Sequence, residues 1–175
     1  NTKLISINFP NNPTGKIISS DELNNLIKLA RKFNIYIFSD EVYRGIETDE
    51  TKRMPQVADV YEKGLSLNVM SKAYGLPGLR IGWIAGQDTA LLEKLERFKH
   101  YLTICNSGPS EILSLIALKA RDKILLKNNK LIFDNLNKLD NFFLEFPNTF
   151  EWKRPDGGAV AYPKYIGPGS TDQFC

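Results

Sequence analysis

Alternation of apolar and polar residues marks the start of the chain. It covers residues 3–9 and predicts a strand with two different faces. A continuous apolar run at residues 35–38 is typical of a strand buried on both faces. Between them, apolar residues recur at helical spacing over about residues 20–33, and Ser19 with Glu22 forms a capping-box pattern. Strand, helix and strand in this order predict a βαβ unit.

Two more strands are predicted at residues 65–69 and 80–85, with a loop rich in Gly and Pro at 73–78 between them. Too few residues separate these strands for the dozen or more that a parallel crossover needs. We therefore expect them to be antiparallel if they share a sheet, and the sheet to be mixed.

Helical spacing dominates the chain from Asp88 onward. It predicts one helix at 91–102, a second that starts at 107–109, and a long one over 124–146 that Pro147 ends. A helix of about 24 residues is roughly 36 Å long, enough to bridge two domains. The remaining segment carries strand-like pieces on both sides of a Pro-Asp-Gly-Gly sequence, which favours the beginning of a second, smaller domain.

The composition is that of an ordinary globular protein. Of 175 residues, 42% are hydrophobic and 25% charged, which excludes disordered, collagen-like and low-complexity classes. The formal net charge is only +3 and the basic residues are scattered, so no nucleic-acid partner is predicted. No apolar run approaches the roughly 18 residues of a membrane span, so no membrane partner is expected either.

The cysteines indicate a reducing compartment. Cys105 and Cys175 are far apart, so they form neither a disulfide framework nor a metal site with CxxC spacing, and a cytoplasmic location fits best. We expect Cys105 to pack as a small apolar group. The chain has no initiator Met and stops at Cys175, just after the polar segment 169–172, so we expect a fragment of a longer protein.

Polar side chains of different chemistry follow the predicted strands. Asn12 follows the first strand, Asp40 and Tyr43 the second, and Lys72 the third, with Arg80 eight residues later. Open α/β sheets bind ligands outside the carboxyl ends of their strands. An amine nucleophile beside hydrogen-bonding partners and a phosphate-type cation points to carbonyl chemistry, in which lysine forms a Schiff base.

Each of these features also has a simpler explanation. Asn-Pro-Thr-Gly at 12–15 is a good turn sequence, and Asp40 is also a suitable helix cap. Lys72 alone is typical of a surface lysine, and the glycines near it are consistent with loop shaping only. Their joint occurrence at strand ends, in one order, favours a shared site.

Three motifs carry a family resemblance. They are NPTG at 12–15, SDEVY at 39–43 and SKAYGLPGLRIG at 71–82. In sequence, order and spacing they resemble the motifs of class I/II aminotransferases, which are fold type I pyridoxal phosphate (PLP) enzymes. The resemblance covers residues 3–166, and the third motif is the most specific because its lysine, glycines and arginine stand at fixed relative positions.

The resemblance implies a fold and a domain organisation. The fold would be α/β, with the three-layer α/β/α mixed sheet of the PLP-dependent transferase large domain and the start of a small α+β domain. Residues 1–120 would form the C-terminal part of the large PLP-binding domain, residues 121–146 a long connecting helix, and residues 147–175 the truncated start of the small C-terminal domain.

The same resemblance implies roles for the motif residues. Lys72 would hold PLP as a Schiff base and then move the proton between the substrate and the cofactor. Asp40 would keep the pyridine nitrogen protonated, so that the ring withdraws electrons. Asn12 and Tyr43 would hydrogen-bond the phenolate oxygen and thereby lower the pKa of the imine, and Arg80 would bind the phosphate.

The phosphate site departs from the family pattern. Many relatives carry a serine three residues before the lysine, where this chain has Val69. Ser71 is the candidate that would replace it in part. Relatives also use residues well upstream of Asn12 and an arginine near the C-terminus, and no residue of this chain matches either.

The expected reaction is transfer of an amino group from an amino acid to a 2-oxo acid, in a homodimer. A lyase or cyclising enzyme on the same fold is an alternative, because the same carbanion also eliminates a β-substituent. Another is an aminotransferase-like domain of a transcriptional regulator. From these 175 residues alone we expect little or no turnover.

Overall fold

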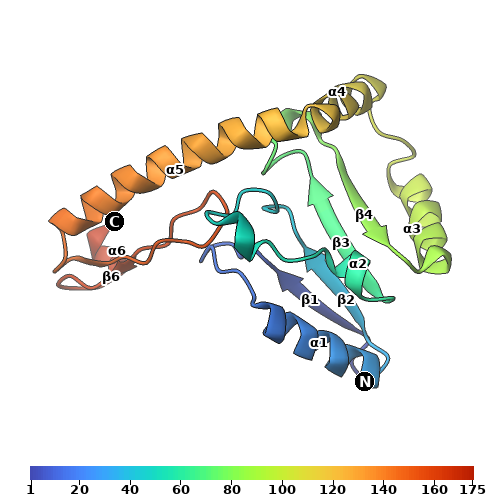
Figure 1. Ribbon diagram of the computed structural model, residues 1–175, viewed down its shortest axis with the longest axis horizontal. Coiled ribbons are helices and arrows are strands. Elements are labelled where there is room, and N and C mark those ends of the chain that lie inside the picture. The colour runs from blue at the N-terminus through green and yellow to red at the C-terminus, as the bar shows by residue number, and fades with distance from the viewer.

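A four-stranded mixed sheet forms the centre of the fold. The computed structural model describes residues 1–175, and the strands are β1 (Leu4–Asn8), β2 (Tyr36–Asp40), β3 (Gly64–Val69) and β4 (Gly82–Gly86), in that spatial order. The first three are parallel and β4 is antiparallel to β3 (Figure 1). The expected mixed sheet and α/β class are thereby confirmed.

Helix α1 (Ser20–Lys32) covers one face of this sheet. Its capping box is formed as expected, with the Ser19 side chain and the Glu22 side chain each accepting from the other's backbone N–H. Its apolar stripe packs with β2 and with the short helix α2 (Val57–Val60) in one core cluster. The buried members of this cluster are Leu23, Ile27, Ala30, Ile35, Ile37, Val57 and Tyr61.

The opposite face of the sheet is more open. Because side chains alternate along a strand, Leu4 of β1 points away from the α1 face, to which Ile5 belongs. Leu4 is 50% exposed and Ile84 of β4 is 40% exposed. By the same alternation and register, Asn8 and Asp40 point to this open face at the strand ends.

Three helices follow the sheet: α3 (Thr89–Leu102), α4 (Gly108–Lys119) and α5 (Arg121–Glu145). Helix α5 has 25 residues, about 37 Å at 1.5 Å per residue, and runs from the sheet to the far end of the molecule (Figure 1). Periodicity alone predicted its start at residue 124, three residues late, because residues 121–123 are polar. The prediction for Cys105 is wrong, since this residue lies exposed between α3 and α4.

The C-terminal segment packs on the end of α5 through aromatic rings. Strands β5 (Phe150–Glu151) and β6 (Lys164–Tyr165) pair antiparallel, and a short helix α6 (Thr171–Phe174) follows. Phe143 of α5 stacks on Trp152 with ring centroids 4.6 Å apart. This segment corresponds to the predicted residues 147–175, whose assignment to a separate domain stays a prediction.

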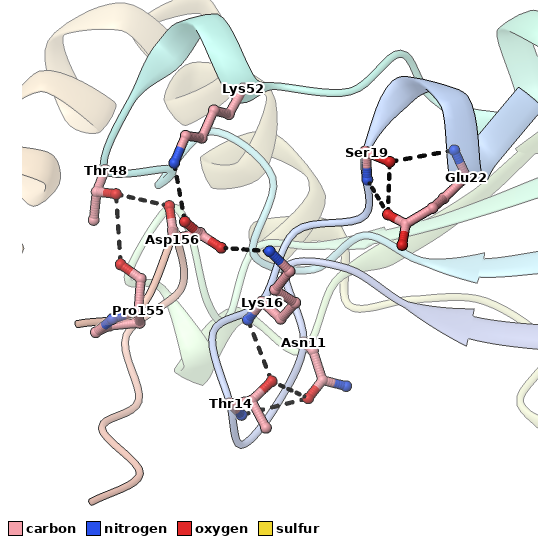
Figure 2. Close-up of polar contacts among 9 residues, drawn as sticks. All are labelled: Asn11, Thr14, Lys16, Ser19, Glu22, Thr48, Lys52, Pro155 and Asp156. Atoms are coloured by element: carbon pink, nitrogen blue, oxygen red, sulfur yellow. Dashed lines mark hydrogen bonds and ion pairs between the residues drawn. The ribbon is translucent and has the colours of Figure 1, made fainter. Parts of the chain in front are cut away.

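Between β5 and β6 the chain returns to the sheet, and we call its contacts there the tail clasp (Figure 2). The Asp156 carboxylate binds Lys16 at 3.3 Å and Lys52 at 3.0 Å. The Asp156 backbone oxygen accepts from Thr48 N at 2.9 Å, and Gly157 N donates to Gly15 O at 3.0 Å. The clasp therefore ties the tail to the loop after β1 and to the segment that follows Tyr43.

Candidate active site

All six residues predicted from the sequence line one pocket of about 620 Å³ at the carboxyl ends of β1, β2 and β3. A pocket of this size falls within the ordinary range for small-molecule sites. Four other residues contribute to its lining. The complete set is Asn8, Asn12, Asp40, Val42, Tyr43, Val69, Ser71, Lys72, Pro77 and Arg80.

Strand pairing sets the position of Asp40. It is the last residue of β2 and stands in register with Asn8 of β1 and Leu67 of β3. Its carboxylate oxygen Oδ1 accepts from the Val42 backbone N–H at 3.2 Å, a local turn that fixes the side chain. One carboxylate is thus held at the floor of the pocket in the middle of the sheet edge.

Tyr43 and Asn12 meet across the pocket. The Asn12 Nδ2 donates to the Tyr43 hydroxyl at 3.4 Å. The Tyr43 ring is buried, 4% exposed, in a cluster with Ile46, Ala73 and Leu125 of α5. This packing leaves the phenol little freedom, so its hydroxyl is presented to the pocket at a fixed place.

A tight turn after β3 presents Lys72. Met70 N donates to Ile81 O at 2.9 Å, and Gly75 N donates to Lys72 O at 3.0 Å. Asn128 of α5 donates to Ala73 O at 2.8 Å and holds the turn from outside. The Lys72 amine lies 5.9 Å from the centroid of the Tyr43 ring, on the side of the turn that faces the pocket.

Arg80 closes the pocket from the far side of the same loop. Its backbone is left-handed, with φ of 56°, at the end of the short 3-10 helix Pro77–Leu79. Its guanidinium donates to the Pro77 backbone oxygen at 3.1 Å, which leaves further N–H groups for an anion. Ser71 also lines this part of the pocket. Val69 stands where many relatives carry a serine, and its side chain offers no hydrogen-bond donor.

A buried carboxylate supports the loop between Asp40 and Tyr43. Glu41 is 5% exposed, and its Oε1 accepts from Val57 N at 3.0 Å and from the Ser66 hydroxyl at 2.8 Å. Its Oε2 has no hydrogen-bond partner. Burial raises the pKa of Glu41 above its ordinary value, although these hydrogen bonds act in the opposite direction. No local sequence pattern predicts that this acidic residue is internal.

Asn8 is the polar lining residue that the sequence analysis missed. It ends β1 and points to the pocket beside Asp40. The strand-end rule that selected the other residues also applies to Asn8, because it is the last residue of the first strand. Asn8 was not predicted because it belongs to none of the three motifs.

The fold and the pocket define an α/β protein with an amine, a carboxylate, a phenol, an amide and a guanidinium collected at the ends of parallel strands. The sequence profile described as "Aminotransferase class I and II" matches residues 1–165. The chain belongs to this family, and the resemblance inferred from its motifs is confirmed.

Individual relatives agree with this assignment. A protein named "Probable aspartate/prephenate aminotransferase" from Rickettsia prowazekii (strain Madrid E) is 34% identical over 169 residues, which are 93% of this chain and 41% of the relative. A crystal structure of a PLP-dependent aminotransferase from Streptococcus suis 89-1591 has a TM-score of 0.91 at 34% identity, over 99% of this chain and 45% of that chain.

A relative with another activity has the same fold. The crystal structure of the PLP-dependent cyclase OrfR matches with a TM-score of 0.86 at 26% identity, over 99% of this chain and 47% of that chain. The chain thus spans less than half of the length of each of these three relatives. None of the helices in the structure is both long enough and apolar enough to cross a membrane.

Proposed function

We propose that the protein is a PLP-dependent aminotransferase that moves an amino group from an amino acid to a 2-oxo acid through a Schiff base on Lys72. The observation that carries this proposal is the single pocket that holds Lys72 together with Asp40, Asn12, Tyr43 and Arg80. The similarity to a PLP-dependent aminotransferase at 34% identity over nearly the whole chain supports it.

The residues fit PLP by the chemistry of their donors and acceptors. Bound PLP supplies an aldehyde carbon and an electron-withdrawing pyridine ring, which stabilises negative charge at the substrate's α-carbon. The Arg80 guanidinium is a planar donor suited to a phosphate, and Ser71 adds a hydroxyl on the same side. The Asp40 carboxylate suits a protonated ring nitrogen, and Asn12 with Tyr43 suits a phenolate oxygen.

Each residue then has a distinct task. The Lys72 amine holds the cofactor until the substrate amine replaces it, and afterwards moves the proton between the substrate's α-carbon and C4′ of the cofactor. Asp40 keeps the proton on the ring nitrogen. The Asn12 and Tyr43 donors stabilise the phenolate and so lower the pKa of the neighbouring imine, which suits a reaction near neutral pH.

The test is a visible absorbance spectrum of the complete protein with PLP, for the wild type and Lys72→Ala, with borohydride reduction to make the lysine bond permanent. We expect a Schiff-base band in the wild type that is lost in Lys72→Ala, with a peptide containing Lys72 labelled after reduction. Lys127→Ala, an exposed lysine on α5, is the matched control and should keep the band. An unchanged band in Lys72→Ala would show that other lysines are labelled and would reject this assignment.

A lyase or cyclising activity on the same fold is the second candidate. The similarity to the cyclase OrfR favours it, because that protein shares the fold over nearly this whole chain. Product analysis with the complete protein separates the two. An amino group that appears on an added 2-oxo acid indicates transfer, whereas pyruvate and ammonia formed without an acceptor indicate elimination.

We also propose that the complete protein acts as a homodimer in the cytoplasm. Apolar residues at the end of α3 are exposed, with Tyr101 at 87%, Leu102 at 62% and Ile104 at 73%, and an interface between copies would remove them from water. Both cysteines are free and exposed, which suits a reducing compartment. Light scattering of the purified complete protein tests the dimer.

A further inference from the structure

We propose that Asn8 is a positioning residue of this site, whose carboxamide holds the loop at residues 9–15, here called the Asn12 loop, against the end of β2. The inference rests on the proposed function where it concerns PLP, and on the geometry alone where it concerns the loop. The three sequence motifs do not include Asn8.

The two halves of the Asn8 carboxamide bind two different segments. Its Nδ2 donates to the Asp40 backbone oxygen at 3.1 Å, and its Oδ1 accepts from the Asn12 backbone N–H at 2.8 Å. Asp40 and Asn12 are both predicted cofactor contacts. One side chain thus bridges the strand end that carries the carboxylate and the loop that carries the amide.

The backbone bond from Phe9 N to Asp40 O, 3.2 Å, holds the start of the loop to the end of β2 but does not reach Asn12, and most other bonds of the loop are internal. Asn11 N donates to Lys16 O at 2.8 Å, and Gly15 N donates to Asn11 O at 2.7 Å. The Asn11 side chain accepts from the Thr14 hydroxyl at 2.7 Å (Figure 2). These bonds set the shape of the loop, whereas its position relative to β2 depends on Asn8 and the Phe9 N–H at one end and on the tail clasp at the other.

The position of the loop matters because the hydrogen bond between Asn12 and Tyr43 is long. Asn12 Nδ2 and the Tyr43 hydroxyl are 3.4 Å apart, close to the limit of a hydrogen bond. A shift of about 1 Å at a positioning group is enough to cost a reaction a large factor in rate. Without Asn8, we expect Asn12 to move away from Tyr43 and from the oxygen that both would bind.

The first measurement is hydrogen exchange of the Asn12 amide in the cofactor-free complete protein. In Asn8→Ala this amide loses its acceptor, and we expect exchange about fivefold faster, the factor for one hydrogen bond of about 1 kcal/mol. Asn8→Asp keeps an acceptor for the Asn12 amide and should restore most of its protection. Asn68→Ala removes an amide at the end of β3 that binds Gln56, outside the pocket, and should leave Asn12 exchange unchanged.

The second measurement is a pH titration of the visible band of the PLP-loaded protein. We expect its midpoint to move to higher pH in Asn8→Ala, because the phenolate loses the Asn12 donor, and to stay in place in Asn68→Ala. A purely structural role of Asn8 would lower stability without moving this midpoint.

The outcomes separate the inference from the proposed function. Unchanged exchange at Asn12 in Asn8→Ala would overturn the inference, and so would faster exchange with an unchanged midpoint. A wild-type protein that gives no PLP band at all would overturn the proposed function instead. The exchange measurement would then still decide whether Asn8 holds the Asn12 loop.

Discussion

Replacement of Gly15 by alanine should open the tail clasp. The Gly15 backbone is left-handed, with φ of 66°, and a Cβ there would lie 2.2 Å from Cβ of Pro155 and 2.8 Å from the Gly157 oxygen. Both atoms belong to the tail segment, whose Gly157 N–H donates to the Gly15 carbonyl oxygen. The alanine methyl group and the tail therefore cannot occupy their places together.

The magnitude follows from two costs. A left-handed conformation costs a residue with a Cβ about 1 kcal/mol or slightly more relative to glycine. Overpacking against a neighbour adds about 1–3 kcal/mol. We expect Gly15→Ala to lower the free energy of unfolding by about 2–4 kcal/mol, with displacement of the tail setting the upper limit.

Urea unfolding of wild type, Gly15→Ala and Gly108→Ala measures this loss. Gly108 is the first residue of α4, and a Cβ there meets nothing within 4 Å, so its alanine variant should stay within about 0.5 kcal/mol of wild type. Hydrogen exchange at the Gly157 and Gly158 amides should also accelerate in Gly15→Ala. A loss below about 1 kcal/mol, or an equal loss in the Gly108 control, would refute the steric reasoning.

Two further predictions concern charge. Asp156→Asn removes both ion pairs of the tail clasp. The Asp156 side chain is 24% exposed, and its partners Lys16 and Lys52 are 60% and 53% exposed. Urea unfolding should therefore show a loss of about 1 kcal/mol in the free energy of unfolding at low salt. This difference should shrink in about 0.5 M NaCl, and a loss independent of salt would contradict the electrostatic account. Glu41→Gln should flatten the pH dependence of stability. Because the pKa of Glu41 is raised in the folded protein, Glu41 contributes stability below pH 4.5, its ordinary pKa, and this contribution is lost as the pH rises through the raised pKa. Urea midpoints between pH 4.5 and neutrality measure this slope, and parallel curves for the two proteins would contradict the role of Glu41.

Local patterns were sufficient to predict much of the fold. Alternation located β1, and the Ser19 capping box located the start of α1, because both signals depend only on neighbours in the chain. The short loop before β4 predicted its antiparallel pairing for the same reason. Because ligands bind at the carboxyl ends of strands, the sequence also predicted that Asn12, Asp40 and Lys72 share a site, and all three line one pocket.

Features that depend on distant partners were not predictable in this way. The burial of Glu41 follows from contacts with Ser66 and Val57, which no local pattern reveals. The role that we propose for Asn8 depends on its register with Asp40. Cys105 lies at the break between two helices, next to Ile104 with a left-handed φ of 59°, so helical spacing does not apply to it.

The tail clasp also has a consequence for the order in which the protein folds. Lys16 and Asp156 are 140 residues apart, whereas Asn8 and Asp40, which join β1 to β2, are 32 residues apart. Closing the longer loop costs about 1.3 kcal/mol more chain entropy. We therefore expect the parallel sheet with α1 to form before the clasp, so that the Asn12 loop gains its second anchor last. For the same reason we expect the tail segment to be the first part to detach when the native protein opens locally.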